Sequence, residues 1–454
     1  MNIAHQYRQK NISAEKAAGL IKSGDWVDYG HMLSSPVFMD QALSKRVGEI
    51  QDVKIRCSGF PNFSAVVMAD PKQESFTYNT AFLTLADRAL NTDGTVKHIP
   101  GLYHEIPGFS TQHHHTDACI IRTGPMDEKG FFNYGICNDC QSEMIPNAKM
   151  LIVEVNESIP TCLGGLHESV HISDVDFIVE SDNEPLLDLP SVEPSENDKM
   201  IAEHVIREIR DGACLQLGIG GMPNALGKLI AQTDLKNLGV HTEMMVDAYV
   251  DLYESGRITN KKKYLDKGKM TYTFAIGSKR LYDFLDNNPI CASYPVSYTN
   301  DPYKISLNDN AVSINGCLEV DLFGQVSSES SGFRQISGTG GQFDFHFGAY
   351  HSEGGKSFVC MNSTRTDNEG NIYSNIRPFL EPGTIVTLQR TVIHNVVTEY
   401  GIAMLKGKSV WERAEALIDI AHPDFRDGLI NDAEEMRIFT NRNKAVLESL
   451  HLMA

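Results

Sequence analysis

The apolar residues and glycines of residues 214–243 predict a strand, a turn, a helix and a second strand. Residues 214–217 form an apolar run typical of a buried strand. Three glycines then allow a tight turn, and apolar residues at helical spacing follow over 223–232. Residues 238–242 predict the next strand, and Glu243 follows at its end.

A unit of the same order occurs near the start of the sequence. Residues 25–29 predict a strand, 37–46 a helix and 53–57 another strand, and a helix precedes each unit, at 13–23 and at 198–209. Two such units favour an α/β fold with two related open domains and mainly parallel sheets. Further strands are predicted at 75–79, 118–123, 150–155 and 177–180.

The segment 182–197 separates the two units and is rich in proline and acidic residues, with little periodicity. This composition is typical of a linker. We therefore place the domain boundary near Glu193, which gives an N-terminal domain of residues 1–193 and a C-terminal domain of residues 194–454.

The second half contains another glycine cluster and further elements. Alternation over 313–322 predicts strands, with the polar amide of Asn315 among apolar residues, where it needs a partner. The cluster SGTGGQFDF holds Gly338, Gly340 and Gly341, and it is either an anion cradle made of backbone N–H groups or a tight turn between strands. Residues 411–421 predict a helix.

The turn made by Gly218, Gly220 and Gly221 opens onto the predicted helix N-terminus. Free backbone N–H groups and the positive end of the helix dipole suit a phosphate or a developing oxyanion there. Because neighbouring parallel strands end on the same edge of a sheet, we expect Glu243 nearby. The alternative is a glycine turn that only lets the helix pack closely on the strand.

Two nucleotide-binding motifs are incomplete at this turn. Gly218 and Gly220 fit the dinucleotide fingerprint, and Glu243 has roughly the offset of a ribose-binding acid, but Pro223 replaces the third glycine. A P-loop would need Ser or Thr after Lys228, where Leu229 stands. An NAD-dependent oxidoreductase is therefore a weaker hypothesis than an anion cradle beside a carboxylate.

Composition narrows the function classes. The chain has 40 basic and 59 acidic residues, a formal net charge of -19 and a pI near 5.3, so we expect no nucleic-acid partner. No apolar run approaches a membrane span, and the first residues lack the apolar core of a signal peptide. We expect a soluble, cytoplasmic protein without membrane contact.

The cysteines and histidines give no strong metal signal. Nine scattered cysteines suit reduced thiols, and Cys137 with Cys140 forms a lone CxxC without the second pair of a structural zinc site. His113, His114 and His115 are consecutive, so their side chains cannot all converge from a regular element, and we interpret them as a polar loop. No metal site is predicted.

Several motifs resemble the acetyl-CoA hydrolase/transferase family, with the nearest likeness to butyryl-CoA:acetate and 4-hydroxybutyrate CoA-transferases. The likeness covers essentially the whole chain. The motifs are SGDWVDYG from Ser23, LIVEVN from Leu151, GIGGMPNALG from Gly218, GVHTEM from Gly239, SGTGGQFDF from Ser337, VTEYG from Val397 and ERAEALIDIAHPDFR from Glu412.

The resemblance implies an active site between two α/β domains and a glutamate, Glu243, that forms a covalent thioester with coenzyme A. Coenzyme A is then a substrate, and no cofactor is permanently bound. Asn315 matches an asparagine near the carboxylate substrate, and the family likeness also suggests a homo-oligomer. The residues implied to contact the coenzyme or its thioester are Gly218, Ile219, Gly220, Gly221, Met222, Asn315, Gly341 and Lys356.

The implied reaction moves coenzyme A between a short-chain acyl-CoA and acetate by a ping-pong mechanism through Glu243. Acyl-CoA and short-chain carboxylic acids are the expected partners. An acyl-CoA hydrolase using the same glutamate stays open as an alternative, and a CoA-binding module without catalysis is disfavoured because Glu243 is retained.

Overall fold

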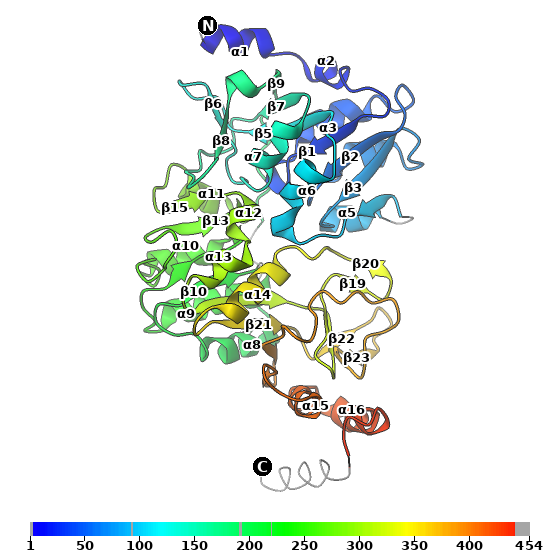
Figure 1. Cartoon of the computed structure of the whole chain (residues 1–454), viewed down its shortest axis with the longest axis vertical. Coiled ribbons are helices and arrows are strands. Elements are labelled where there is room, and N and C mark those ends of the chain that lie inside the picture. The colour runs from blue at the N-terminus through cyan, green and yellow to red at the C-terminus, as the bar shows by residue number, and fades with distance from the viewer. Residues whose placement is uncertain (1–2, 92–93, 190–192, 219, 441–454) are drawn as a thin grey trace.

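The computed structural model describes residues 3–91, 94–189, 193–218 and 220–440. Two mainly parallel β-sheets follow one another along the chain, one in each half, and the halves pack end to end (Figure 1). Helices α1 (Ile3–Lys10) and α16 (Pro423–Glu435) lie at opposite ends of the long axis (Figure 1). The predicted α/β class with mainly parallel sheets is confirmed.

The first sheet has seven parallel strands in the order β4-β3-β2-β1-β5-β7-β9. Its interior strand β5 is buried along its whole length, as expected of a parallel strand covered on both faces. The elements of this half that follow α1 are α2 (Ala14–Ala18), β1 (Trp26–Tyr29), η1 (Met32–Ser34), α3 (Val37–Ser44), β2 (Val53–Cys57), α4 (Ala65–Ala69), β3 (Phe76–Thr80), α5 (Leu85–Leu90), β4 (Val96–His98), η2 (Tyr103–Glu105), α6 (Ile106–Gln112), β5 (Ala118–Thr123), β6 (Phe131–Asn133), α7 (Gln141–Met144), η3 (Ile145–Asn147), β7 (Leu151–Val155), β8 (Ser169–His171), η4 (Ile172–Asp174) and β9 (Phe177–Glu180).

The second sheet has six strands in the order β11-β10-β16-β21-β25-β26, parallel except for the edge strand β26. The elements of this half that precede α16 are α8 (Glu196–Ile206), β10 (Cys214–Leu217), α9 (Gly221–Gln232), β11 (Gly239–Val240), β12 (Met244–Met245), α10 (Asp247–Glu254), β13 (Met270–Tyr272), β14 (Phe274–Ala275), α11 (Lys279–Leu285), β15 (Cys291–Ser293), α12 (Val296–Thr299), α13 (Pro302–Ser306), β16 (Ala311–Gly316), β17 (Glu319–Asp321), β18 (Val326–Ser327), β19 (Ser330–Ser331), β20 (Arg334–Gln335), α14 (Gln342–His351), β21 (Lys356–Cys360), β22 (Thr364–Thr366), β23 (Ile372–Ser374), β24 (Ile376–Arg377), β25 (Asn395–Thr398), β26 (Gly401–Met404) and α15 (Val410–Asp419).

The predicted strand at 238–242 differs from the structure in a way that matters for Glu243. β11 belongs to the six-stranded sheet, whereas β12 pairs with β14 in a separate two-stranded sheet. The chain therefore leaves the main sheet after Val240, and Glu243 stands between the two short strands. Its carbonyl accepts the N–H groups of Thr273 and Phe274 at 3.0 and 3.2 Å, which fixes the backbone at this point.

The second glycine cluster is followed by a helix that the sequence pattern did not predict. Gly341 caps α14, and the helix is buried at Phe345 and Ala349. Of the two readings of this cluster, a turn between strands is wrong. A Cβ on Gly338 would overlap the carbonyl oxygen of Ala81, so glycine there lets the chain before α14 approach the N-terminal half closely.

Three other expectations can be compared with the described residues. All nine cysteines are unpaired, as expected for reduced thiols. The proposed domain boundary falls between β9 and α8 and stays a prediction. No helix in the described part of the chain is both long and apolar enough to cross a membrane.

Candidate active site

Glu243 lies at the wall of a cavity of about 500 Å³ between the two halves. The N-terminal half contributes Met32 and Tyr103 to this cavity, and the C-terminal half contributes Glu243 and Gly340. Most of the remaining wall is apolar, which suits an acyl chain. Apolar lining residues include Phe82, Leu83, Leu85, Leu187, Phe274 and Ile276.

Two groups bind the carboxylate of Glu243 directly. The amide nitrogen Nδ2 of Asn300 donates to Oε2 of Glu243 at 2.6 Å, and the backbone N–H of Gly341 also donates to the carboxylate. A Cβ atom on Gly341 would overlap both Glu243 Oε2 and Asn300 Nδ2. Glycine at 341 is therefore required by the approach of the carboxylate to the start of α14.

Burial raises the pKa of Glu243 to about 8. The hydrogen bond from Asn300 works against this shift, while the negative charges of Asp344 and Asp139 add to it. A carboxyl group with such a pKa is a stronger nucleophile when it is ionised than an exposed carboxylate is. The site can therefore hold Glu243 as a reactive carboxylate at mildly alkaline pH.

The two acidic neighbours of Glu243 come from different elements. Asp344 lies in the first turn of α14 and binds His104 of η2, with 2.8 Å between Asp344 Oδ1 and His104 Nδ1. Asp139 lies before α7 and accepts the hydroxyl of Tyr103 at 2.6 Å. Two neighbouring residues of η2 thus bind the two acids, Tyr103 binding Asp139 and His104 binding Asp344. This turn of the N-terminal half therefore contacts both charged neighbours of Glu243.

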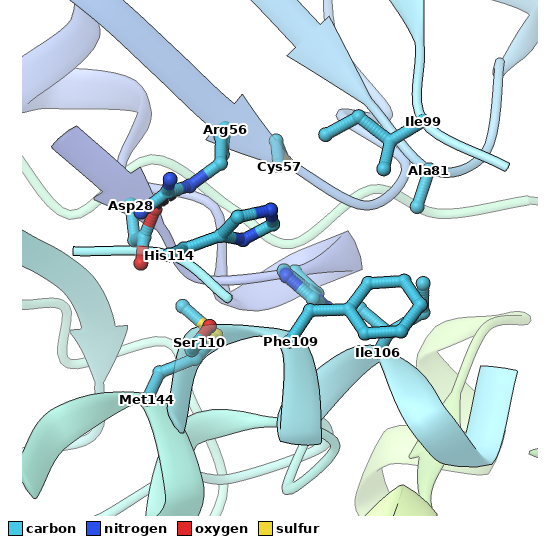
Figure 2. Close-up of a pocket in the computed structure, with 11 residues that line it drawn as sticks. Asp28, Arg56, Cys57, Ala81, Ile99, Ile106, Phe109, Ser110, His114 and Met144 are labelled. Carbon is cyan, nitrogen blue, oxygen red and sulfur yellow. Dashed lines mark hydrogen bonds and ion pairs between the residues drawn. The ribbon is translucent and has the colours of Figure 1, made fainter. Parts of the chain in front are cut away.

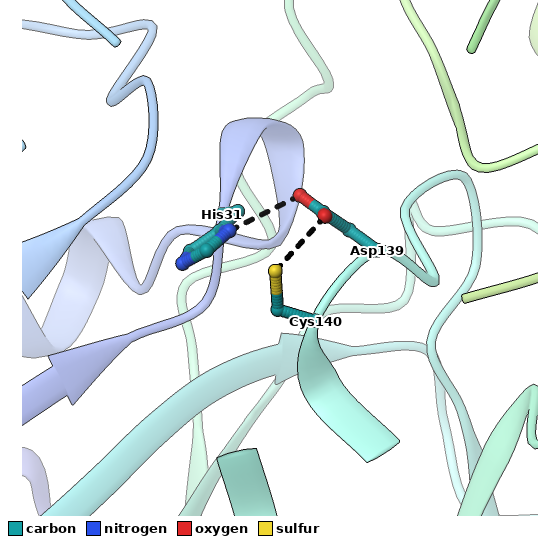
Figure 3. Close-up of side chains that lie close together, drawn as sticks. All are labelled: His31, Asp139 and Cys140. Carbon is teal, nitrogen blue, oxygen red and sulfur yellow. Dashed lines mark hydrogen bonds and ion pairs between the residues drawn. The ribbon is translucent and has the colours of Figure 1, made fainter. Parts of the chain in front are cut away.

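Asp139 is also the centre of a buried cluster with His31 and Cys140 (Figure 3). Its Oδ2 lies 3.2 Å from Nδ1 of His31, and its Oδ1 accepts the thiol of Cys140 at 3.1 Å. The three side chains offer ligand atoms within 4.8 Å of one another, a set that a transition metal can use. Because Tyr103 also binds Asp139 and every contact has hydrogen-bond length, we interpret the cluster as a hydrogen-bond network that orients Asp139.

The first glycine turn lines a different cavity, of about 220 Å³, together with Cys360 and Asn362. Gly220 has φ 124°, a conformation that favours glycine, and a Cβ on Gly221 would lie 2.5 Å from Oδ2 of Asp198. The turn and Glu243 do not line a common cavity, because the chain leaves the main sheet before Glu243. The members of the predicted coenzyme set found here are Gly218, Gly220, Gly221 and Met222, and Ile219 lies outside the described residues.

Asn315 is placed beside the glycine turn rather than beside Glu243. β16 runs parallel to β10 with Ile314 opposite Leu217, so Asn315 follows at the same sheet edge as Gly218. Its amide nitrogen donates to Oε1 of Gln216 at 3.1 Å. The asparagine that contacts Glu243 is Asn300, which the sequence motifs did not indicate.

Lys356 begins β21, opposite Val312 in the parallel register, and so lies at the other end of the sheet from the glycine turn. Its ammonium binds a carboxylate oxygen of Glu208 at 2.5 Å. Strand register thus separates Lys356 from the glycine turn, and its expected coenzyme contact stays a prediction.

The three consecutive histidines follow α6 and do not converge. His113 and His115 are exposed, as expected of a polar loop. His114 turns towards a small pocket of about 30 Å³, near the buried ion pair of Arg56 and Asp28, whose Nε–Oδ1 distance is 2.6 Å (Figure 2). Burial lowers the pKa of His114, with Arg56 adding to the effect. This pocket adjoins the cavity at Glu243, because Ala81 and Ile106 line both.

Comparison with known proteins gives matches over nearly the whole chain. Models of the acetyl-CoA hydrolase/transferase N-terminal and C-terminal domains match residues 1–189 and 277–433. The chain is 48% identical over 446 residues to butyryl-CoA:acetate CoA-transferase of Anaerostipes caccae, covering 98% of this chain and 100% of that protein. It is 40% identical over 430 residues to 4-hydroxybutyrate coenzyme A transferase of Clostridium kluyveri, covering 94% and 97%. The solved structure of RipA from Yersinia pestis superposes with a TM-score of 0.89 at 35% identity, covering 97% of this chain and 100% of that one.

Proposed function

This chain belongs to the acetyl-CoA hydrolase/transferase family, and from that premise we propose that it is a CoA-transferase whose nucleophile is Glu243. The proposed donor is a short-chain acyl-CoA of the butyryl or 4-hydroxybutyryl type, and the proposed acceptor is acetate, as the names of the relatives suggest. One observation carries the assignment of the nucleophile. Glu243 faces an apolar cavity between the two halves while Asn300 and the Gly341 N–H bind its carboxylate.

The first half of the proposed reaction forms a thioester on Glu243. A carboxylate oxygen of Glu243 attacks the acyl carbonyl carbon, the C–S bond breaks, and an acyl-glutamyl anhydride and CoA thiolate result. The thiolate then attacks the glutamyl carbonyl carbon. The anhydride C–O bond breaks, the donor acid leaves as a carboxylate, and Glu243 carries coenzyme A.

The second half reverses these bond changes with the acceptor. Acetate attacks the glutamyl thioester, thiolate leaves, and the thiolate then attacks the acetyl carbonyl to release acetyl-CoA and the free Glu243 carboxylate. The N–H groups of Gly341 and Asn300 lie beside the glutamyl carboxyl, where they can donate to each tetrahedral oxyanion. Such a donor contributes about 3 kcal/mol. Coenzyme A is thus a substrate, and the scheme uses no permanently bound cofactor.

We keep the first glycine turn as a proposed coenzyme contact. Its N–H groups open onto α9, a helix of 12 residues, which favours a negative group there. Gly218, Gly220, Gly221 and Met222 line the adjoining cavity.

The cytoplasm is the proposed location, supported by nine unpaired cysteines. A homo-oligomer stays a proposal from the family likeness.

The acceptor dependence separates a transferase from a hydrolase. With butyryl-CoA and acetate, we expect acetyl-CoA to form in step with butyrate and without free thiol. Without acetate, turnover should stop after one equivalent of butyrate per active site, because the apolar cavity disfavours attack by water. Liquid chromatography of the CoA esters and a thiol reagent measure both. Continuous thiol release that acetate does not suppress would establish the hydrolase alternative instead.

The rate of the first half-reaction should rise with pH up to about pH 8. Only the ionised form of Glu243 attacks, and burial raises the pKa of this residue to about 8. Below that pH the ionised fraction, and with it the rate, should increase about tenfold per pH unit and then level off. Rapid-quench measurement of butyrate release in a single turnover, at fixed ionic strength, gives the profile. A flat profile between pH 5.5 and about pH 8 would show that Glu243 titrates as an ordinary carboxyl group.

A further inference from the structure

His104 and Asp344 join the two halves of the molecule close to Glu243. The imidazole Nδ1 of His104 lies 2.8 Å from Asp344 Oδ1, and the backbone N–H of His104 donates to Oδ2 at 3.2 Å. Asp344 is fully buried, and His104 is half-buried. Burial disfavours a charged imidazole, but the hydrogen bond and the charge of Asp344 outweigh it and raise the pKa of His104. The contact is therefore a buried, two-point link between η2 and α14.

The amide of Asn300 connects this link to Glu243. Its nitrogen donates to Glu243 Oε2 at 2.6 Å, and its side chain also hydrogen-bonds with Asp344. Its oxygen Oδ1 is buried and has no hydrogen-bond partner within the described residues. If the amide rotated by half a turn, that oxygen would face two carboxylates. Asp344 and Glu243 together thus favour the orientation in which the Asn300 nitrogen, and not its oxygen, points at the two carboxylates.

We propose that Asp344, held by His104, is a positioning residue for the glutamyl transfer: it orients the Asn300 amide and places a negative charge beside Glu243. This inference rests on the proposed function. Glu243 is charged as a carboxylate but neutral as a thioester, so a neighbouring negative charge disfavours the first form and favours the second.

The other groups that face Glu243 are consistent with this role. Besides Asp344, the charge of Asp139 acts on Glu243, and Tyr103, whose hydroxyl binds Asp139, lines the same cavity. Burial is the largest cause of the raised pKa of Glu243, and Asp344 contributes more to it than Asp139 does. Of the two charges, removal of Asp344 should therefore change the pKa of Glu243 more.

The test compares Asp344→Asn with the full-length wild-type protein. Asparagine keeps the size of the side chain but removes its charge. We expect the midpoint of the acid limb for butyrate release to fall by about one pH unit, because one pKa unit is the shift that a close like charge typically causes. At about pH 9, where Glu243 is ionised in both proteins, the ratio of enzyme–CoA thioester to free enzyme, at fixed butyryl-CoA and butyrate, should fall about tenfold. Intact-protein mass spectrometry measures that ratio.

A second pair between the halves supplies the matched control. His98 Nε2 lies 3.9 Å from Oε2 of the buried Glu329, outside the groups acting on Glu243. Glu329→Gln should leave the midpoint within about 0.3 pH unit of wild type. It should leave the thioester ratio within about twofold of wild type, which is about the precision of such measurements. An equal change in Glu329→Gln and Asp344→Asn would overturn the proposal in favour of a general effect on domain packing.

Asp344→Ser keeps the proposal testable if Asp344→Asn alone unfolds. Serine also removes the negative charge but leaves a smaller, neutral hydrogen-bonding group, so the midpoint and the thioester ratio should change in the same direction as in Asp344→Asn. An unchanged midpoint in whichever of the two variants folds would overturn the proposal. If wild type itself forms no thioester, the proposed function fails instead, so the two failures are distinguishable.

Discussion

Replacing Glu243 by glutamine is expected to abolish CoA transfer, with a loss of at least about 10³-fold in kcat. Glutamine keeps the shape of the side chain and a contact with Asn300, but its amide oxygen is a poor nucleophile and cannot form the anhydride. Glu243→Asp should lose about 10²-fold or more, because the carboxylate is withdrawn by one methylene from its place against Gly341. Steady-state assays with butyryl-CoA and acetate measure both losses.

Folding must be retained for these losses to report chemistry. Because burial makes an ionised Glu243 unfavourable, Glu243→Gln should unfold at the same temperature as wild type or a higher one at pH 8. Glu329→Gln, which changes a buried glutamate elsewhere in the C-terminal half, should keep transfer activity near the wild-type level. Transfer by Glu243→Gln at more than a tenth of the wild-type rate would rule out Glu243 as the nucleophile.

Replacing Gly341 by alanine is expected to reduce the rate by about 10²-fold, with a larger loss for valine. The reason is steric, because the new Cβ would overlap the Glu243 carboxylate and the Asn300 amide. The backbone φ of Gly341 is -90°, so strain does not enter. The added group displaces the nucleophile itself. The family resemblance implied a contact of Gly341 with the coenzyme or its thioester, whereas in the structure its N–H binds the carboxylate of Glu243.

Gly428 provides the matched glycine for this experiment. It lies in α16, and a Cβ there meets no atom within 4 Å. Gly428→Ala should leave kcat unchanged and slightly raise the unfolding temperature, as alanine favours a helix. Wild-type turnover by Gly341→Ala would mean that the carboxylate does not occupy this position in the working enzyme.

Local patterns predicted many element boundaries well. The strand predictions at 214–217, 53–57, 118–123 and 177–180 coincide with β10, β2, β5 and β9. Of these, β5 and β10 are buried along their whole length, as expected of interior parallel strands. The pattern at 238–242 did not show that the chain leaves the six-stranded sheet after Val240. The next strand, β12, pairs with β14, and a sequence pattern does not reveal which strands pair.

The surroundings of Glu243 depend on contacts that sequence spacing does not reveal. Asn300 reaches Glu243 from the end of α12, and His104 comes from the other half of the molecule. Both are ordinary polar residues in turns, without a motif of their own. Asp344 had one usable signal, since an acid three residues after Gly341 is typical of the first turn of a helix.

The central claim is that Glu243 carries coenzyme A during turnover, and trapping the intermediate tests it most directly. The enzyme is incubated with butyryl-CoA without an acceptor acid and then treated with borohydride, which reduces a glutamyl thioester to a stable alcohol. Peptide mass mapping should find that reduction at Glu243 alone, and neither without butyryl-CoA nor in Glu243→Gln. Reduction at another carboxylate, with transfer persisting in Glu243→Gln, would contradict the account.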